Sequence, residues 1–311
     1  MSVKELCEIA SPGLMLSQTW PTSNQKRDAT REALETAIEA NFFTAFQTVE
    51  VNFAEERKKI AHLIGTRGYA YTYCITRVLN GNHLNLSDLH DSNRIRSYQK
   101  AIHCLNDARE AGADSLSLIS GPSPENNESR GDALKLLVDS LSHIAVAANK
   151  EPRIRLVIEP LDVHSHKKMT LGYAAEALKI CEELSSNDLP VSLCLDTAHL
   201  FLNGEDPVYA LQQAKNYTTE FHYCNCVVEP SHPLYGDRHI RFGQPGVLDI
   251  QGIGRIMKKQ VEMRFLNNED RPIIMCEVLK TDNDQSKELM EYSIGVLTES
   301  WELAQVTIEK D

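Results

Sequence analysis

The sequence predicts an α/β fold in which strands and helices alternate from residue 1 to residue 311. Short apolar runs bounded by turn residues recur along the chain, and segments with helical periodicity separate them. No low-complexity or linker-like segment interrupts this alternation, and no G-x-G-x-x-G motif follows the first apolar run, which disfavours a doubly wound open sheet. Eight strand–helix pairs at this spacing indicate one (β/α)8 barrel that forms a single domain.

The N-terminal half is expected to supply the first four strand–helix pairs. The strands are predicted at residues 5–10, 42–51, 69–75 and 115–120. The helices between and after them are predicted at 25–40, at 54–65, in a segment that ends near 111–113, and at 128–149. Gly112 indicates the end of the third helix, since glycine commonly follows the last helical residue.

The C-terminal half continues the same pattern. Its four strands are predicted to end at Glu159, at Asp196, near Cys226 and at Glu277. Helices are predicted at 170–184, 207–215, 249–265 and 285–304, and residues 232–246 are predicted to form a long loop.

Composition indicates a soluble protein of the cytoplasm. The net charge of −12 disfavours a nucleic-acid partner, because such affinity depends on lysine and arginine neutralising phosphates. The eight cysteines follow no framework of a small secreted protein, and several fall inside predicted strands, so free thiols are expected. The N-terminus lacks a long apolar signal region, and no apolar run reaches the roughly 20 residues that span a membrane.

Four successive apolar runs in the C-terminal half lead into a side chain that can bind a metal. These side chains are Glu159, Asp196, His222 and Glu277. With a strand period of two, they face the barrel interior, while bulky neighbours such as Leu195 face the helices. Arg155 and Glu220 are expected deeper in the same interior as an ion pair.

Two glutamates, one aspartate and one histidine form a hard donor set that suits one divalent ion. Mn²⁺ is the expected ion, with Mg²⁺, Co²⁺ and Zn²⁺ as alternatives. Such an ion stabilises negative charge on a carbonyl oxygen, so Glu159 and Glu277 are expected as the catalytic acid/base pair for a proton on the adjacent carbon. Taken singly, each acidic residue at a strand end also fits a simple helix cap.

The pattern Glu159-Pro160, Asp196-x-x-His199, His222 and Glu277 resembles the xylose isomerase-like TIM barrel superfamily, which holds sugar isomerases and epimerases together with endonuclease IV. The resemblance implies that Glu159, Asp196, His222 and Glu277 hold one metal ion, that the two glutamates move the proton, and that His199 contacts the substrate.

Four further predictions concern the rest of the pocket. His239 and Arg241 are expected as substrate contacts, and Trp20 either walls the pocket or packs against the core. Asp237 and His239 also fit an ordinary ion pair of a loop, and Cys224-Asn225-Cys226 is interpreted as barrel filling because no second cysteine pair completes a zinc site.

The loop at 232–239 also resembles the endonuclease IV branch, in which the residues matching Asp237 and His239 help to bind three zinc ions. That cluster requires histidines at the ends of the third and fourth strands. This chain has Tyr73-Cys74-Ile75 and Ser120-Gly121-Pro122 there, which disfavours a nuclease.

The predicted function is therefore a divalent-metal-dependent isomerase or epimerase that acts on a keto sugar. Its expected partner is a small-molecule sugar substrate, with no nucleic acid and no membrane, and the formation of a homo-oligomer is left open. A lyase or dehydratase that uses the same base, a DNA-repair endonuclease and a non-catalytic sugar-binding barrel are the alternatives.

Overall fold

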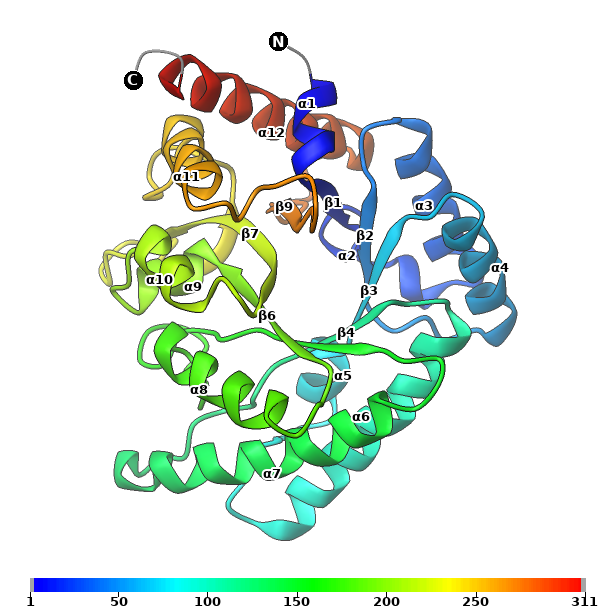
Figure 1. Ribbon diagram of the computed structural model, residues 1–311, viewed down its shortest axis with the longest axis vertical. Helices are drawn as coiled ribbons and strands as arrows, with labels where there is room; N and C mark the ends of the chain where they lie inside the picture. The colour runs from blue at the N-terminus through cyan, green and yellow to red at the C-terminus, as the bar shows by residue number, and fades with distance from the viewer. Residues whose placement is uncertain (1–2, 309–311) are drawn as a thin grey trace.

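The computed structural model describes residues 3–308 and contains a closed barrel of eight parallel strands with helices outside it (Figure 1). The barrel strands are β1 (Ser11–Met15), β2 (Ala45–Thr48), β3 (Ala70–Cys74), β4 (Ser115–Leu118), β5 (Arg155–Ile158), β6 (Val191–Asp196), β7 (Thr218–Val227) and β9 (Ile273–Glu277). The barrel closes because β9 pairs in parallel with both β7 and β1. This architecture confirms the predicted (β/α)8 barrel.

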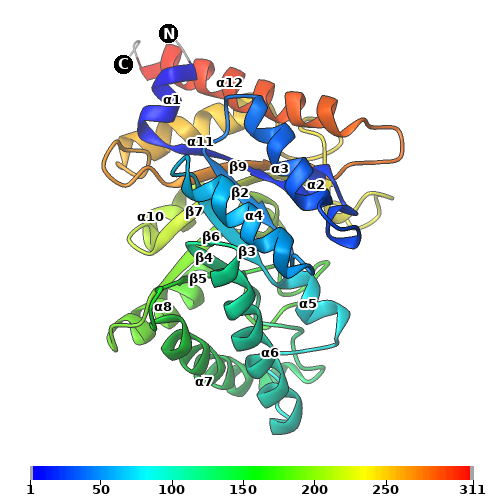
Figure 2. The same cartoon turned by 90° about the vertical axis from the view of Figure 1, so that its right-hand side faces the viewer.

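Twelve α-helices lie in the described residues, and most follow a barrel strand. They are α1 (Val3–Ile9), α2 (Leu16–Thr19), α3 (Ala29–Glu39), α4 (Ala54–Gly65), α5 (Thr76–Gly81), α6 (Asp91–Glu110), α7 (Arg130–Ala148), α8 (Ala174–Ser185), α9 (Thr197–Leu202), α10 (Pro207–Ala214), α11 (Ile250–Glu262) and α12 (Ser286–Ile308). Helix α1 lies beside α12 in both views (Figures 1 and 2), where Gln305 Nε2 donates to Glu5 Oε2 at 2.5 Å. Within these ranges, none of the helices has both the length and the apolar character needed to cross a lipid bilayer.

The prediction of a first strand at residues 5–10 is wrong, because this segment forms helix α1. Leu6 in α1 and Ala10 directly after it are both fully buried, and the N–H of Ala10 donates to the carbonyl of Leu6 at 2.9 Å, so their spacing of four residues is that of one helix face. The true first strand contains Pro12 and Gly13, two residues that disfavour strands. Gly13 is required by packing, since a Cβ atom there would lie 2.9 Å from the Met275 side chain.

The prediction of a loop over residues 232–246 is also incomplete. Strand β8 (Gly236–Ile240) lies in it and pairs antiparallel with the end of β7, as a hairpin at one end of the barrel. Gly236 has a φ of +96°, and a Cβ atom there would lie 2.6 Å from the His166 ring. Only glycine suits this position.

Strand side chains follow the expected alternation between helices and barrel interior. Leu193, Leu195 and Phe221 belong to the apolar core under the helices. Glu220 instead accepts a hydrogen bond from Thr72 Oγ1 at 2.7 Å, between β7 and β3. The expected ion pair of Glu220 with Arg155 is wrong, because Arg155 is exposed at the start of β5 and no ion pair joins the two in the described residues.

Helix α3 is capped by a carboxylate from the next helix. Its own N-cap residue, Asp28, makes no side-chain cap hydrogen bond, whereas the backbone N–H groups of Thr30 and Arg31 donate to Glu56 Oε1 at 2.9 and 3.1 Å. We expect Glu56→Ala to lower the free energy of unfolding by about 2 kcal/mol, because it leaves a buried N–H group without an acceptor. Urea denaturation measures the change. Glu56→Gln keeps an acceptor oxygen, so its free energy of unfolding is expected to fall less. An equal decrease in the two variants would contradict the capping role.

Candidate functional site

The side chains of Glu159, Asp196, His222 and Glu277 converge at the C-terminal end of the barrel. Their ligand-capable atoms all lie within 4.8 Å of one another, and we call them the four-residue cluster. They come from or directly follow β5, β6, β7 and β9, which are neighbours in the barrel. Exposure is 9% for Glu159 and 3% or less for the other three, so the cluster is almost closed to bulk water.

Asp196 divides its two carboxylate oxygens between two environments. Oδ1 accepts from the backbone N–H groups of Ala198 at 2.7 Å and His199 at 3.3 Å, which caps helix α9. Oδ2 is buried and has no hydrogen-bond partner in the described residues. The helix-cap interpretation of this strand-end acid therefore accounts for one oxygen, and the other remains available to a ligand.

Glu277 is the most constrained carboxylate of the cluster. Its Oε1 lies 2.6 Å from Nδ1 of His222, and its Oε2 lies 3.1 Å from Nδ1 of His239. Gln18 Nε2, from α2, donates to the same Oε2 at 3.4 Å. No hydrogen bond from the described residues holds the Glu159 carboxylate in this way.

Burial and the charges of neighbouring side chains shift the pKa values of these three acids. Burial raises the pKa of Glu159 to about 7, and the nearby charge of Glu277 adds to this rise. Burial also raises the pKa of Asp196 to about 6. Burial alone would raise the pKa of Glu277 as well, but His222 and His239 hold it well below its ordinary value. Three acids around one imidazole therefore need additional positive charge, either protons or a cation.

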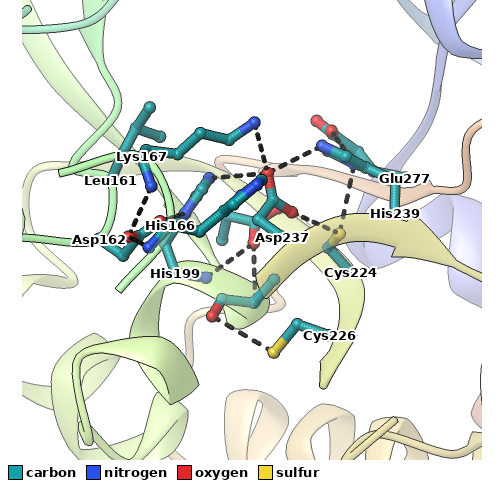
Figure 3. A network of polar contacts seen from close by, with 12 residues as sticks. Leu161, Asp162, His166, Lys167, His199, Cys224, Cys226, Asp237, His239 and Glu277 are labelled. Carbon is teal, nitrogen blue, oxygen red and sulfur yellow. Dashed lines mark hydrogen bonds and ion pairs between the residues drawn. The ribbon is translucent and has the colours of Figure 1, made fainter. Parts of the chain in front are cut away.

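A second group of polar side chains surrounds Asp237 beside the cluster (Figure 3). Asp237 Oδ2 lies 3.1 Å from both His239 Nε2 and Lys167 Nζ, and 3.8 Å from His199 Nε2. Asp162 Oδ2 contacts the other nitrogen of His199 at 3.3 Å. These carboxylates raise the pKa of His199 to about 9, against the effect of burial, which lowers it. Both histidines are thus oriented by buried acids.

Arg241 and Trp20 lie outside the four-residue cluster. The Arg241 guanidinium pairs with Asp284 at 2.6 Å and lies 4.5 Å from the centre of the Tyr292 ring, with its side chain 48% exposed. Trp20 is partly buried and packs against the apolar core. A substrate contact of either residue stays a prediction, as it does for His199 and His239.

Three polar residues near the cluster were not predicted as site residues. Asp162 accepts from the backbone N–H groups of His166 and Lys167, which fixes the loop after β5 and brings Lys167 to Asp237. Gln18 reaches Glu277 from the short helix α2. The only signal for Asp162 and Lys167 is the density of polar residues after Glu159, and nothing in the sequence marks Gln18.

Most cysteines are buried thiols, and two of them border the site. The Cys194 thiol lies within 4.8 Å of ligand-capable atoms of Glu159 and His222. All eight are free thiols, and all except Cys7 are buried. Cys224 Sγ lies 3.3 Å from His239 Nδ1, so one thiol of the Cys224-Asn225-Cys226 motif borders the site. At the ends of β3 and β4, where the endonuclease IV branch has histidines, this barrel has Cys74 and Ser120.

The fold is similar to solved structures of sugar epimerases. For the 3-keto-D-glucoside 4-epimerase of E. coli, the TM-score is 0.65 at 14% sequence identity, covering 93% of this chain and 99% of that one. For D-psicose 3-epimerase from Clostridium cellulolyticum H10, solved with D-tagatose, the TM-score is 0.69 at 12% sequence identity, covering 94% of this chain and 99% of that one. For the IolI protein with a bound zinc atom, the TM-score is 0.69 at 13% sequence identity, covering 94% of this chain and 98% of that one. At these identities the likeness shows a shared fold alone.

Comparison at the level of sequence gives the family. A search against characterised proteins found no significant match. The family model described as xylose isomerase-like TIM barrel, however, matches residues 27–298, which include all four members of the cluster. With the closed parallel barrel, this match establishes that the chain belongs to the xylose isomerase-like TIM barrel family.

Proposed function

We propose that this protein is a divalent-metal-dependent sugar isomerase or epimerase that removes a proton from the carbon next to the carbonyl of a keto sugar. The observation that carries the proposal is the convergence of the four-residue cluster within 4.8 Å. It lies at the C-terminal end of the strands, the end at which (β/α)8 enzymes place their active sites. The fold shared with several sugar epimerases supports the substrate class.

The cluster has the properties that a metal ion requires. Asp196 Oδ2 is buried without a hydrogen-bond partner in the described residues, and Glu277 Oε1 and His222 Nδ1 face each other at 2.6 Å. The basic side chains close by are engaged elsewhere, since Lys167 pairs with Asp237 and Arg241 with Asp284. Three carboxylates and one imidazole suit Mn²⁺ best, with Mg²⁺, Co²⁺ or Zn²⁺ as alternatives. A divalent ion held here supplies Lewis-acid stabilisation of negative charge on the carbonyl oxygen.

Glu159 and Glu277 are the proposed acid/base pair. They are the outer members of the row of four strand ends, so a substrate placed between them meets one carboxylate at each end. Glu159, which no described hydrogen bond restrains, accepts the proton from carbon. Glu277, held by Gln18 and His239, returns a proton that it takes up from His239, whose Nδ1 lies 3.1 Å from Glu277 Oε2 and which regains a proton from solvent. Return to the same carbon inverts its configuration, and return to the neighbouring carbon moves the carbonyl.

His199 and His239 are proposed to bind substrate hydroxyl groups. Both are buried or nearly buried beside the cluster, and Asp237 and Asp162 orient their rings. Arg241 and Trp20 are proposed to contribute at the rim. The expected partner is thus a small sugar, and the net charge of −12 argues against a nucleic-acid substrate.

Proton exchange tests this proposal directly. The protein is incubated with Mn²⁺ in deuterated water with a panel of free and 3-keto sugars, and products are analysed by mass spectrometry and NMR. The proposal predicts deuterium on the carbon next to the carbonyl, together with an isomeric sugar. An unsaturated product would instead identify the lyase alternative, and cleavage of abasic DNA with no exchange would identify the nuclease.

A further inference from the structure

A buried carboxylate lies beneath His222 on the same strand. Glu220 and His222 are two residues apart in β7, so their side chains project from the same face of the strand into the barrel. Each is 1% exposed. Glu220 therefore occupies the layer below the four-residue cluster.

The two ring nitrogens of His222 face different acids. Nδ1 lies 2.6 Å from Glu277 Oε1, on the side of the cluster, whereas Nε2 lies 3.6 Å from Glu220 Oε2. Among the described residues, neither Nε2 of His222 nor Oε2 of Glu220 has a hydrogen-bond partner. The separation of 3.6 Å exceeds a formed hydrogen bond, so the pairing rests on charge. The uncharged thiol of Cys194 also lies near the His222 ring, within 4.8 Å.

Other contacts hold Glu220 in this place. Its Oε1 accepts from Thr72 Oγ1 at 2.7 Å, which leaves Oε2 directed at His222. A cavity of about 890 Å³ opens at the opposite end of the barrel and is lined by Thr72, Glu220 and Arg155 among others. Arg155 lines this cavity without pairing with Glu220. A buried carboxylate costs stability unless a partner compensates its charge, and in the described residues the basic side chain that faces Glu220 is the imidazole of His222.

We infer that Glu220 is a positioning residue for the metal ligand His222. Its negative charge favours a proton on Nε2, so that Nδ1, which faces Glu277, would offer its lone pair to an ion held by the cluster. Histidine ligands commonly depend on such a carboxylate for their tautomer, ring orientation and basicity. This inference rests on the proposed function, because it assigns Glu220 a role only if the cluster binds a metal.

The test is Glu220→Gln, which preserves size and removes the charge. We expect its Mn²⁺ affinity, measured by competition with a chelator, to fall about 10- to 100-fold. The melting temperature of the metal-free variant is expected to change little, because glutamine keeps the size of the side chain and the oxygen that accepts from Thr72. A purely structural Glu220 predicts the reverse, a lower melting temperature with unchanged affinity.

Two further variants keep the test decisive. Glu269→Gln removes an exposed carboxylate from the same cavity and is expected to leave Mn²⁺ affinity unchanged. If Glu220→Gln does not fold, Thr72→Val is used in its place, because it removes the Oγ1 donor that holds Glu220. Mn²⁺ binding is then expected to weaken several-fold. Unchanged Mn²⁺ affinity in Thr72→Val would overturn the inference. A parent protein that binds no divalent ion overturns the proposed function and this inference together. A parent protein that binds Mn²⁺ no more tightly than Glu220→Gln overturns only the role of Glu220.

Discussion

Replacing Glu159 with glutamine is expected to lower the rate of solvent-proton exchange into the substrate by about 10²- to 10⁴-fold, the contribution typical of a positioned acid or base. The amide has nearly the same shape but takes up no proton. The carboxylate makes no hydrogen bond with the described residues, so little structural support is lost with it. Deuterium incorporation in the presence of saturating Mn²⁺ measures the effect.

A matched control separates this result from a general loss of charge. Glu229 lies just beyond β7 and is exposed, and in the described residues its carboxylate accepts hydrogen bonds from the backbone N–H and the hydroxyl group of Ser231. Glu229→Gln should keep the parental exchange rate. If Glu159→Gln also kept that rate, Glu159 would not be the base, and another group would have to take the proton from carbon.

Replacing Asp196 with asparagine is expected to weaken metal binding by more than about 100-fold while the metal-free fold stays intact. Asparagine keeps an oxygen for the cap on Ala198 and His199 but places an amide nitrogen where Oδ2 faces the cluster. Loss of a direct ligand should exceed the 10- to 100-fold cost typical of residues that only orient one. Chelator competition measures the affinity, and urea denaturation measures the stability of the metal-free protein.

Alanine at the same position provides the comparison. Asp196→Ala removes the ligand and the helix cap together, so it is expected to lose metal binding and about 1 kcal/mol of stability. If asparagine and alanine destabilised the protein equally while metal affinity stayed at the parental value, Asp196 would be a helix cap and nothing more.

The barrel could be predicted from the sequence because most of its strands follow simple physical rules. Strands β5 to β7 and β9 are short apolar runs that alternate between core and interior, and the helices between them show clear periodicity. Strand β1 could not be found in this way. Pro12 and Gly13 obscure it, and its glycine is fixed by the distant Met275 rather than by its neighbours in sequence.

The sequence could predict only those site residues whose positions follow from the order of the strands. Carboxyl ends of neighbouring parallel strands meet at one end of a barrel, so the four-residue cluster followed from the strand ends alone. Asp162 and Lys167 come from an irregular loop whose course depends on backbone hydrogen bonds to Asp162. His239 reaches Glu277 because the β7–β8 hairpin folds back over the barrel, and Gly236 permits that hairpin by leaving room for His166.

The most direct test of the proposed site is the number of metal ions that the protein binds. The chain is stripped with a chelator, titrated with Mn²⁺ and, separately, with Zn²⁺, and the bound metal is counted by mass spectrometry. A single ion per chain, lost in Asp196→Asn, is the result that the four-residue cluster predicts. No bound ion, or an ion that Asp196→Asn retains with parental affinity, would contradict it.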